Sequence, residues 1–149
     1  MPFKVFVGYG ASQGKTIAEK LGHYLVRKGF DVFVASTDPR WLFGQPLSVI
    51  YDELVASDIF IPVCTPNATS SQHLRDEICT CLAVDIPILV LRMDEVAVPP
   101  ELIPRWHIKF EPTRPWGMHQ RINDLLPKLI EWHRENIRNV KSSIVQRSG

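Results

Sequence analysis

The sequence predicts an α/β fold of the flavodoxin-like type, a three-layer sandwich in which helices flank a five-stranded parallel sheet of strand order 2-1-3-4-5. Short β-rich runs alternate with helical periodicity from one end of the chain to the other. The run Ile86–Leu91 is apolar throughout, as in a strand that helices cover on both faces. With 149 residues, 45% of them hydrophobic, the chain is long enough to bury one core. We expect a single domain over residues 1–138 and a frayed tail over residues 139–149, where the periodicity fades.

Each expected element has its own sequence signal. The strands are short runs rich in β-branched and aromatic residues, and they cover Lys4–Val7, Asp31–Ala35, Ile59–Cys64, Ile86–Leu91 and Trp106–Phe110. The helices show apolar residues at spacings of three and four, and their stripes run from Ile17 to Leu25, Leu47 to Val55, Leu74 to Leu82 and Ile122 to Ile130. Gly29 ends the first helix. Thr69 and Gln72 have the spacing of a capping box before the third helix. Pro62, which cannot donate to the ladder, predicts either a bulge in the third strand or a carbonyl group there that finds its partner elsewhere.

The composition excludes several classes of protein. A formal net charge of +1 gives no overall field that would attract nucleic acid or an anionic membrane. No apolar run approaches the roughly 20 residues of a membrane helix, and the N-terminus lacks the pattern of a secretory signal. The cysteines, Cys64, Cys79 and Cys81, are too few for a disulfide scaffold and predict buried free thiols. The free thiols, together with the absence of a signal pattern and of a membrane segment, predict a cytoplasmic location. The histidines form no clustered ligand set, so we expect no metal.

A glycine-rich turn follows the first strand, and its spacing matches neither of two nucleotide-binding motifs. Gly14-Lys15-Thr16 would complete a P-loop only with glycine at position 9, which is Tyr9. The glycines follow G-x-G-x-x-x-G, one residue longer than the dinucleotide fingerprint, with Asp38 as a candidate ribose-binding acid. The chain also has no room for the substrate domain of a dehydrogenase. A P-loop NTPase and a Rossmann dehydrogenase are both disfavoured.

In this fold, ligands bind beyond the carboxyl ends of the strands. Glu77 and His73 are i, i+4 neighbours on the helix that follows the third strand, and the lean of helical side chains aims Glu77 at the ligand edge. Glu77 is either an acid placed for chemistry or a solvated helix residue. Tyr9, at the end of the first strand, is either a ligand contact or a core aromatic. Trp41 and Phe43 lie in a loop, where they either pack down or meet a partner.

Three segments together resemble the Toll/interleukin-1 receptor (TIR) domain family, in its prokaryotic branch. Val5–Tyr9 is similar to the family's first strand, V-F-I-S-Y. Phe30–Asp38, with Gly44 after it, resembles the second strand and the BB loop. Thr65–Asn67 followed by Ser71–Glu77 matches S-P-N … S-x-W-C-x-x-E without a gap. The resemblance covers about residues 3–133. The departures from the family pattern are Gly8 for serine, His73 for tryptophan, Leu74 for cysteine, and Pro46 after the BB-loop glycine.

The resemblance implies an activity that one branch of the family has, cleavage of NAD+ at the nicotinamide–ribose bond, with the glutamate at the position of Glu77 as the essential residue. One carboxylate can suffice, because nicotinamide departs neutral and the acid need only stabilise an oxocarbenium-like centre. NAD+ is then a substrate, and no resident cofactor is expected. The resemblance also implies association through the BB loop, Ser36–Gln45, with further copies of this chain or with other TIR domains, and a role in defence or stress signalling. We expect the pocket to be lined by Tyr9, Gly10, Asp38, Trp41, Phe43 and His73.

Two other functions remain open at this point. The first is a non-enzymatic interaction domain of the same fold, in which the BB loop is adhesive and Glu77 is an inert acid. The second is an enzyme similar to nucleoside deoxyribosyltransferases, a related fold that also uses a glutamate beside a tyrosine.

Overall fold

The strands of the structure form one parallel sheet of order β2-β1-β3-β4-β5, which confirms the predicted fold class and strand order. The computed structural model describes the backbone of residues 3–10, 12–34 and 47–148, and their side chains over 3–10, 13–34 and 49–136. The strands are β1 (Lys4–Tyr9), β2 (Asp31–Val34), β3 (Ile59–Cys64), β4 (Leu89–Met93) and β5 (Trp106–Phe110).

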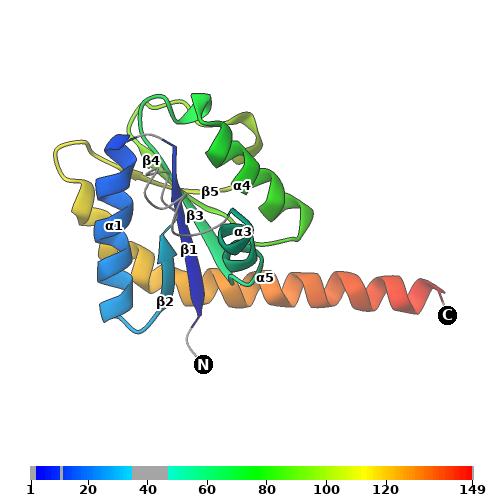
Figure 1. Ribbon diagram of the computed structural model, residues 1–149. Helices are drawn as coiled ribbons and strands as arrows, with labels where there is room; N and C mark the ends of the chain where they lie inside the picture. The colour runs from blue at the N-terminus through cyan, green and yellow to red at the C-terminus, as the bar shows by residue number, and fades with distance from the viewer. Residues whose placement is uncertain (1–2, 11, 35–46, 149) are drawn as a thin grey trace.

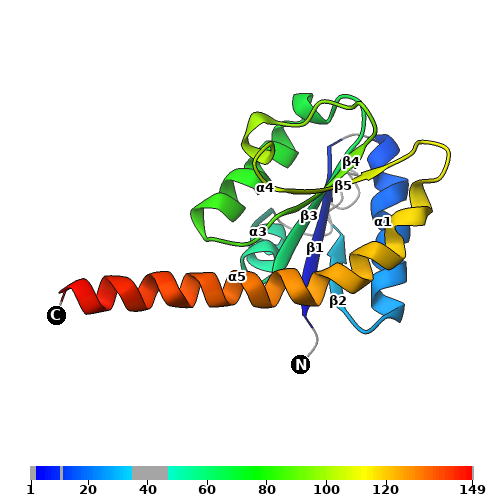
Figure 2. The ribbon, with the colours of Figure 1, turned by 180° about the vertical axis from the view of Figure 1, so that it is seen from behind.

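Helices cover both faces of this sheet, as parallel strands require. Helices α1 and α5 lie on one face, and α3 and α4 lie on the other (Figures 1 and 2). Short 3-10 turns connect some of these elements to the strands. The helices are α1 (Ser12–Arg27), α3 (Leu47–Val55), α4 (Gln72–Ala83) and α5 (His119–Ser148), and the 3-10 turns are η1 (Ala68–Ser70), η2 (Pro100–Leu102) and η3 (Pro115–Met118).

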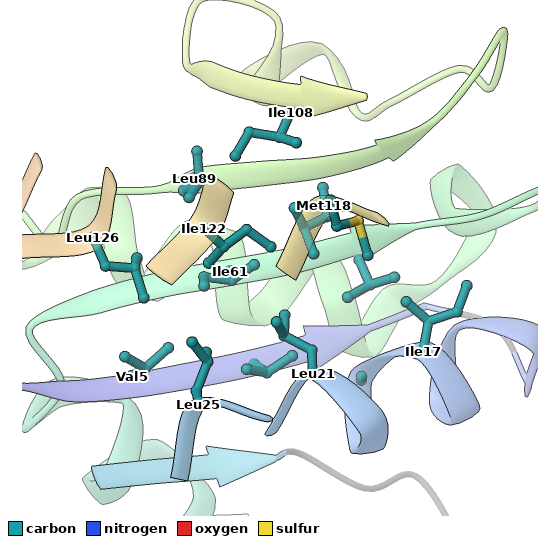
Figure 3. Packing of buried hydrophobic residues seen from close by; sticks show 14 of the residues in the cluster. Val5, Ile17, Leu21, Leu25, Ile61, Leu89, Ile108, Met118, Ile122 and Leu126 are labelled. Atoms are coloured by element: carbon teal, nitrogen blue, oxygen red, sulfur yellow. The ribbon is translucent and has the colours of Figure 1, made fainter. Parts of the chain in front are cut away.

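Each face of the sheet has its own hydrophobic core. On the α1/α5 face, Leu21 and Leu25 of α1 and Leu126 of α5 pack onto the strands (Figure 3). On the α3/α4 face, Phe60 of β3 is fully buried, and its ring lies 5.7 Å from that of Phe6, centroid to centroid. Successive side chains of a strand point to opposite faces, so β1 and β3 contribute to both cores.

Pro62 does not produce the expected bulge in β3. Phe60 pairs with Ile88 and Val63 pairs with Leu91, so the offset between β3 and β4 is the same on either side of the proline. The ladder to β4 is interrupted between these pairs, while Pro62 stays opposite Gly8 of β1. The missing N–H of proline therefore removes bonds to one neighbour without inserting an extra residue.

The start of α4 also differs from the expectation. Ser71 is the N-cap, and its side chain accepts a hydrogen bond from the backbone N–H of Leu74 at 3.2 Å. Thr69 lies within the 3-10 turn η1, so the predicted capping box from Thr69 to Gln72 is wrong. The serine two residues later caps the helix because its extended backbone lets the hydroxyl reach the free N–H groups of the first turn.

The C-terminal segment is helical where we expected it to fray. The backbone of α5 continues through Ser148, and the last part of the helix projects away from the rest of the chain (Figures 1 and 2). Residues 139–148 contain neither glycine nor proline, so a helix already formed can propagate through them.

The three cysteines are free thiols. Cys64 and Cys81 are buried as predicted, and burial raises the pKa of the Cys64 thiol to about 12. Cys79 is exposed, so the prediction of burial is wrong there, because it lies on the outer face of α4.

Within the part of the chain that the structure describes, no helix combines the length and the apolar character of a membrane span.

Candidate functional site

Glu77 lies on the buried face of α4, where an acidic residue is unusual. Its side chain has no exposed surface. Leu74, Ile78 and Cys81 are buried on the same face of the helix, and their spacings of three and four residues place them beside Glu77. Of the two interpretations that the sequence left open, the structure excludes a solvated helix residue.

The carboxyl group of Glu77 lies against the backbone of β1 at Gly8. A Cβ atom added to Gly8 would lie 2.9 Å from Glu77 Oε1 and 2.9 Å from Cε2 of Phe60, closer than real Cβ contacts come. Gly8 is the second-last residue of β1, so the carboxyl group is at the carboxyl end of the sheet, where this fold binds ligands. The absence of a side chain at Gly8 therefore makes the space that the acid occupies.

No described residue compensates the carboxyl group of Glu77. Neither of its oxygen atoms has a hydrogen-bond partner among the described residues. Burial raises the pKa of Glu77 well above its usual range, and the negative charge of Asp76 raises it further. The nearest basic atom given by the structure is His73 Nε2, 3.8 Å from Glu77 Oε2, which is too far for a hydrogen bond. Burial lowers the pKa of His73, against the opposing effect of Asp76. The distance and the two pKa shifts favour a neutral acid beside a neutral imidazole over an ion pair.

The raised pKa of Glu77 predicts that this residue makes folding less favourable as the pH rises. The folded chain holds the Glu77 proton more tightly than the unfolded chain, whose pKa is near the ordinary value of 4.5. The stabilising contribution is complete below that value and is lost as the pH rises toward the folded pKa, at up to about 1.4 kcal/mol per pH unit. Urea unfolding of the parent and Glu77→Gln over about pH 5 to 8 measures it, because other titrating groups cancel in the difference. The parent should lose stability relative to Glu77→Gln as the pH rises, and a difference independent of pH would contradict the assigned charge state.

The structure brings two of the predicted pocket residues to Glu77's side of the sheet. His73 lies one turn before Glu77 on α4. Gly10 packs against the start of α4, since a Cβ atom on it would lie 3.1 Å from Ser71 Cβ and 3.1 Å from Leu74 Cδ2. Both residues therefore belong to the neighbourhood of the acid.

Tyr9 lies on the opposite face of the sheet from Glu77. Its ring belongs to the α1/α5 core and is 2% exposed. It packs against α1, where a Cβ atom on Gly14 would lie 3.0 Å from Tyr9 Cβ. The expectation that Tyr9 and Glu77 face one pocket is wrong, because side chains alternate along a strand and Gly8 already faces α4.

The remaining predicted site residues, Asp38, Trp41 and Phe43, and the whole BB-loop segment Ser36–Gln45, lie outside the described residues.

Sequence reasoning missed three groups around the site. Gly8 and Phe60 form the surface on which the Glu77 carboxyl lies. Tyr51 of α3 is electrostatically coupled to the site: burial raises the pKa of its hydroxyl, and negative charge on Asp76 and Glu77 raises it further. The two-residue period of strands could have indicated Gly8 and Phe60. Phe60 and Pro62 are two residues apart on β3, so they face the same side of the sheet, and Gly8 is the residue of β1 opposite Pro62. Nothing in the sequence pattern indicated Tyr51.

Replacing Gly8 with alanine is expected to lower the free energy of unfolding by about 1–3 kcal/mol, because the added methyl group overpacks the space between Glu77 and the ring of Phe60. The carboxyl group can turn away, but the ring is held by the core. Denaturant unfolding measures the loss. Gly117→Ala is the matched control, since a Cβ atom there meets nothing within 4 Å. Equal stability of the two variants would show that the close approach at Gly8 is not real.

Comparison with protein families gives a match over most of the chain. Residues 5–126 match the family described as TIR domain. This range contains β2 to β5, all of β1 except Lys4, and the candidate acid Glu77. Comparison of the sequence with curated proteins gave no match.

Solved structures with a similar fold have low sequence identity. The CMP N-glycosidase BcmB of Clostridium botulinum is 20% identical with a TM-score of 0.55, over 80% of this chain and 98% of that one. The sugar isomerase domain of an RpiR transcription factor from Sphaerobacter thermophilus is 18% identical with a TM-score of 0.57, over 94% and 78%. The TIR domains of the activated Roq1 resistosome are 15% identical over 89% and 80%, with a TM-score of 0.49, too low to carry an argument. The first two similarities concern the fold alone.

Proposed function

Since the chain belongs to the TIR domain family, we propose that it hydrolyses the bond between nicotinamide and ribose in NAD+, with Glu77 as the catalytic residue. The observation that carries the proposal is the fully buried carboxyl group of Glu77 against Gly8, at the ligand-binding end of the sheet. An uncompensated buried acid costs stability, and such groups concentrate at functional sites.

The chemistry needs one carboxylate. When the bond between C1′ and the pyridinium nitrogen breaks, its electron pair neutralises the nitrogen, and nicotinamide leaves without a proton. The ribose carbon becomes oxocarbenium-like, and the Glu77 carboxylate stabilises the positive charge. Water then adds to C1′ and loses a proton, which gives ADP-ribose; attack by a group of the same nucleotide instead gives a cyclic product.

The substrate itself supplies the charge that ionises Glu77. In the ligand-free protein, burial without a hydrogen-bond partner among the described residues favours the neutral form of Glu77 and raises its pKa. A pyridinium cation beside the carboxyl group favours its ionised form and lowers its pKa. Because Glu77 has no exposed surface, contact with substrate also requires its side chain to turn outward or its surroundings to move.

We also propose that the protein self-associates through the BB loop and acts in defence or stress signalling. If neighbouring copies complete the site, the rate per molecule rises with protein concentration. Gly10 and His73 are the described residues that we place beside the substrate, on the same side of the sheet as Glu77.

The test is incubation of the protein with NAD+ at several protein concentrations, with nicotinamide and the ribosyl product separated by chromatography. The parent chain should release nicotinamide, and Glu77→Gln should release it at least about 100-fold more slowly. Equal release from both chains would reject the role of Glu77. No release from either at any concentration would favour the interaction domain, and base exchange between deoxynucleosides with NAD+ untouched would favour a deoxyribosyltransferase.

A further inference from the structure

The protonation state of Glu77 suits a second class of substrate. An N-riboside whose base is uncharged cannot release that base easily, because the electron pair of the broken bond would leave on it as a negative charge. Such a base departs readily only when an acid protonates it. NAD+ has no such need, since its base already carries the positive charge. A site that holds a buried carboxyl group without a hydrogen-bond partner among the described residues favours the protonated acid, and is therefore equipped for a step that NAD+ does not use.

The described titratable groups around Glu77 favour its protonated form or leave it unchanged. On α4 the titratable neighbours are His73, Asp76 and Cys81. The negative charge of Asp76 raises the pKa of Glu77, while burial lowers the pKa of His73 and raises that of Cys81. On α3 the titratable neighbour is Tyr51, whose pKa is raised.

On the sheet side, β1 and β3 present the backbone of Gly8 and the ring of Phe60, which carry no charge. No cation and no hydrogen-bond donor among these described groups stabilises a carboxylate, and both carboxyl oxygens are buried without a partner.

We propose that the site also cleaves N-ribosides with an uncharged base, and that Glu77 donates the proton that the departing base requires. This inference rests on the proposed function, because it uses the same carboxyl group at the same C1′ atom. It enlarges the substrate class from pyridinium ribosides to nucleosides and nucleotides with neutral bases.

The reaction balances without a further reactant. The Glu77 proton passes to a nitrogen or carbonyl oxygen of the base as the C1′–N bond breaks and its electron pair goes to the base. Water adds to C1′, and the proton that it loses returns to the Glu77 carboxylate. The sum is riboside plus water giving free base plus ribose product, with Glu77 restored to its acid form.

The two substrate classes require opposite protonation states of Glu77, so their rates of cleavage depend on pH in opposite directions. Cleavage of NAD+ uses the carboxylate, so its kcat/KM follows the ionised fraction of Glu77 in the free enzyme. Cleavage of a neutral-base riboside uses the acid, so its kcat/KM follows the protonated fraction. The ratio of neutral-base to NAD+ cleavage therefore falls about tenfold for each pH unit.

A matched pair of substrates tests this. One is NAD+; the other is adenosine 5′-diphospho-5′-uridine, which is NAD+ with uracil in place of nicotinamide. Both contain the same adenosine diphosphate and the same second ribose. Binding of these shared groups and titration of the diphosphate therefore do not contribute to the difference between the two rates. Release of nicotinamide and of uracil is followed by chromatography from about pH 6 to 8, using the parent, Glu77→Gln, and Glu135→Gln as a control with the same chemical change at an exposed site on α5.

We expect the parent and Glu135→Gln to release both bases, Glu77→Gln to release neither, and the uracil-to-nicotinamide ratio to fall about 100-fold over the two pH units. Nicotinamide release without uracil at any pH would overturn the inference and leave the proposed function standing. Uracil release that survives in Glu77→Gln, or a ratio independent of pH, would also overturn it. Uracil release alone would support it and overturn NAD+ as substrate, and release of neither base would overturn both proposals. The pH profile of the parent decides the matter even if Glu77→Gln folds poorly.

Discussion

Replacing Glu77 with glutamine is expected to lower kcat/KM for NAD+ hydrolysis by about 10²- to 10³-fold, the size of loss seen when a group that stabilises transition-state charge is removed. Glutamine has nearly the same shape as glutamate, so it fits the space at Gly8, but it cannot carry the negative charge that stabilises the oxocarbenium-like centre. Initial rates of nicotinamide release at subsaturating NAD+ give kcat/KM directly. The far-ultraviolet circular dichroism of the variant should match the parent.

Two comparisons make this result specific. Glu135→Gln makes the same change on the exposed surface of α5 and should keep the parent rate. If both variants lose activity equally, the loss does not come from the carboxyl group at the site. A Glu77→Gln variant that is folded and retains more than about one-tenth of the parent rate would contradict the catalytic assignment. Loss of a carboxylate that stabilises the reacting carbon lowers kcat/KM by more than the loss of a distant negative charge does.

Replacing Phe60 with alanine is expected to lower the free energy of unfolding by about 3–5 kcal/mol, the usual cost of truncating a fully buried phenylalanine. The ring has no exposed surface, packs on Phe6, and forms one side of the space that holds the Glu77 carboxyl group. Its removal leaves a cavity beside an acid. Such a loss is a large part of the 5–15 kcal/mol that stabilises a typical domain. The midpoint of urea unfolding, with an unchanged slope, measures it.

Val26→Ala is the control for this prediction, because Val26 is 55% exposed and its truncation should change stability by less than about 0.5 kcal/mol. A Phe60→Ala variant as stable as Val26→Ala would mean that the ring is not packed as described. The same variant also reports on the site: water that enters the cavity should lower the pKa of Glu77, so the pH dependence of stability should weaken relative to the parent.

The architecture could be predicted from the sequence because it depends on periodicity alone. β5 begins and ends at the predicted residues, and so does β3. Alternation of strands and helices then leaves few topologies, since parallel crossovers are right-handed. The position of Glu77 near the ligand edge also followed, because it depends on helical spacing and on the direction in which helical side chains lean.

The environment of Glu77 could not be predicted in the same way. Whether a helical acid is buried depends on which face of α4 meets the sheet. Glu77 lies at the border of the apolar stripe that contains Leu74 and Ile78, so the sequence pattern fits either a buried or an exposed side chain. The contact with Gly8 brings together residues far apart in the sequence. The position of Tyr9 differs for another reason. A residue at the ligand end of β1 need not face the ligand, because side chains alternate along the strand, and Tyr9 faces the α1/α5 core.

The register of β1 determines which of its side chains face each side of the sheet. Its odd positions, such as Tyr9, serve one side of the sheet, and its even positions, Phe6 and Gly8, serve the other. A slip of one step in its alignment would exchange these sets and bring a phenol to the place now left vacant for the acid. The hydrogen-bonded pairing of β1 with its neighbours, from Lys4 opposite Asp31 to Tyr9 opposite Val63, thus sets the chemistry at one end of the molecule along with the packing.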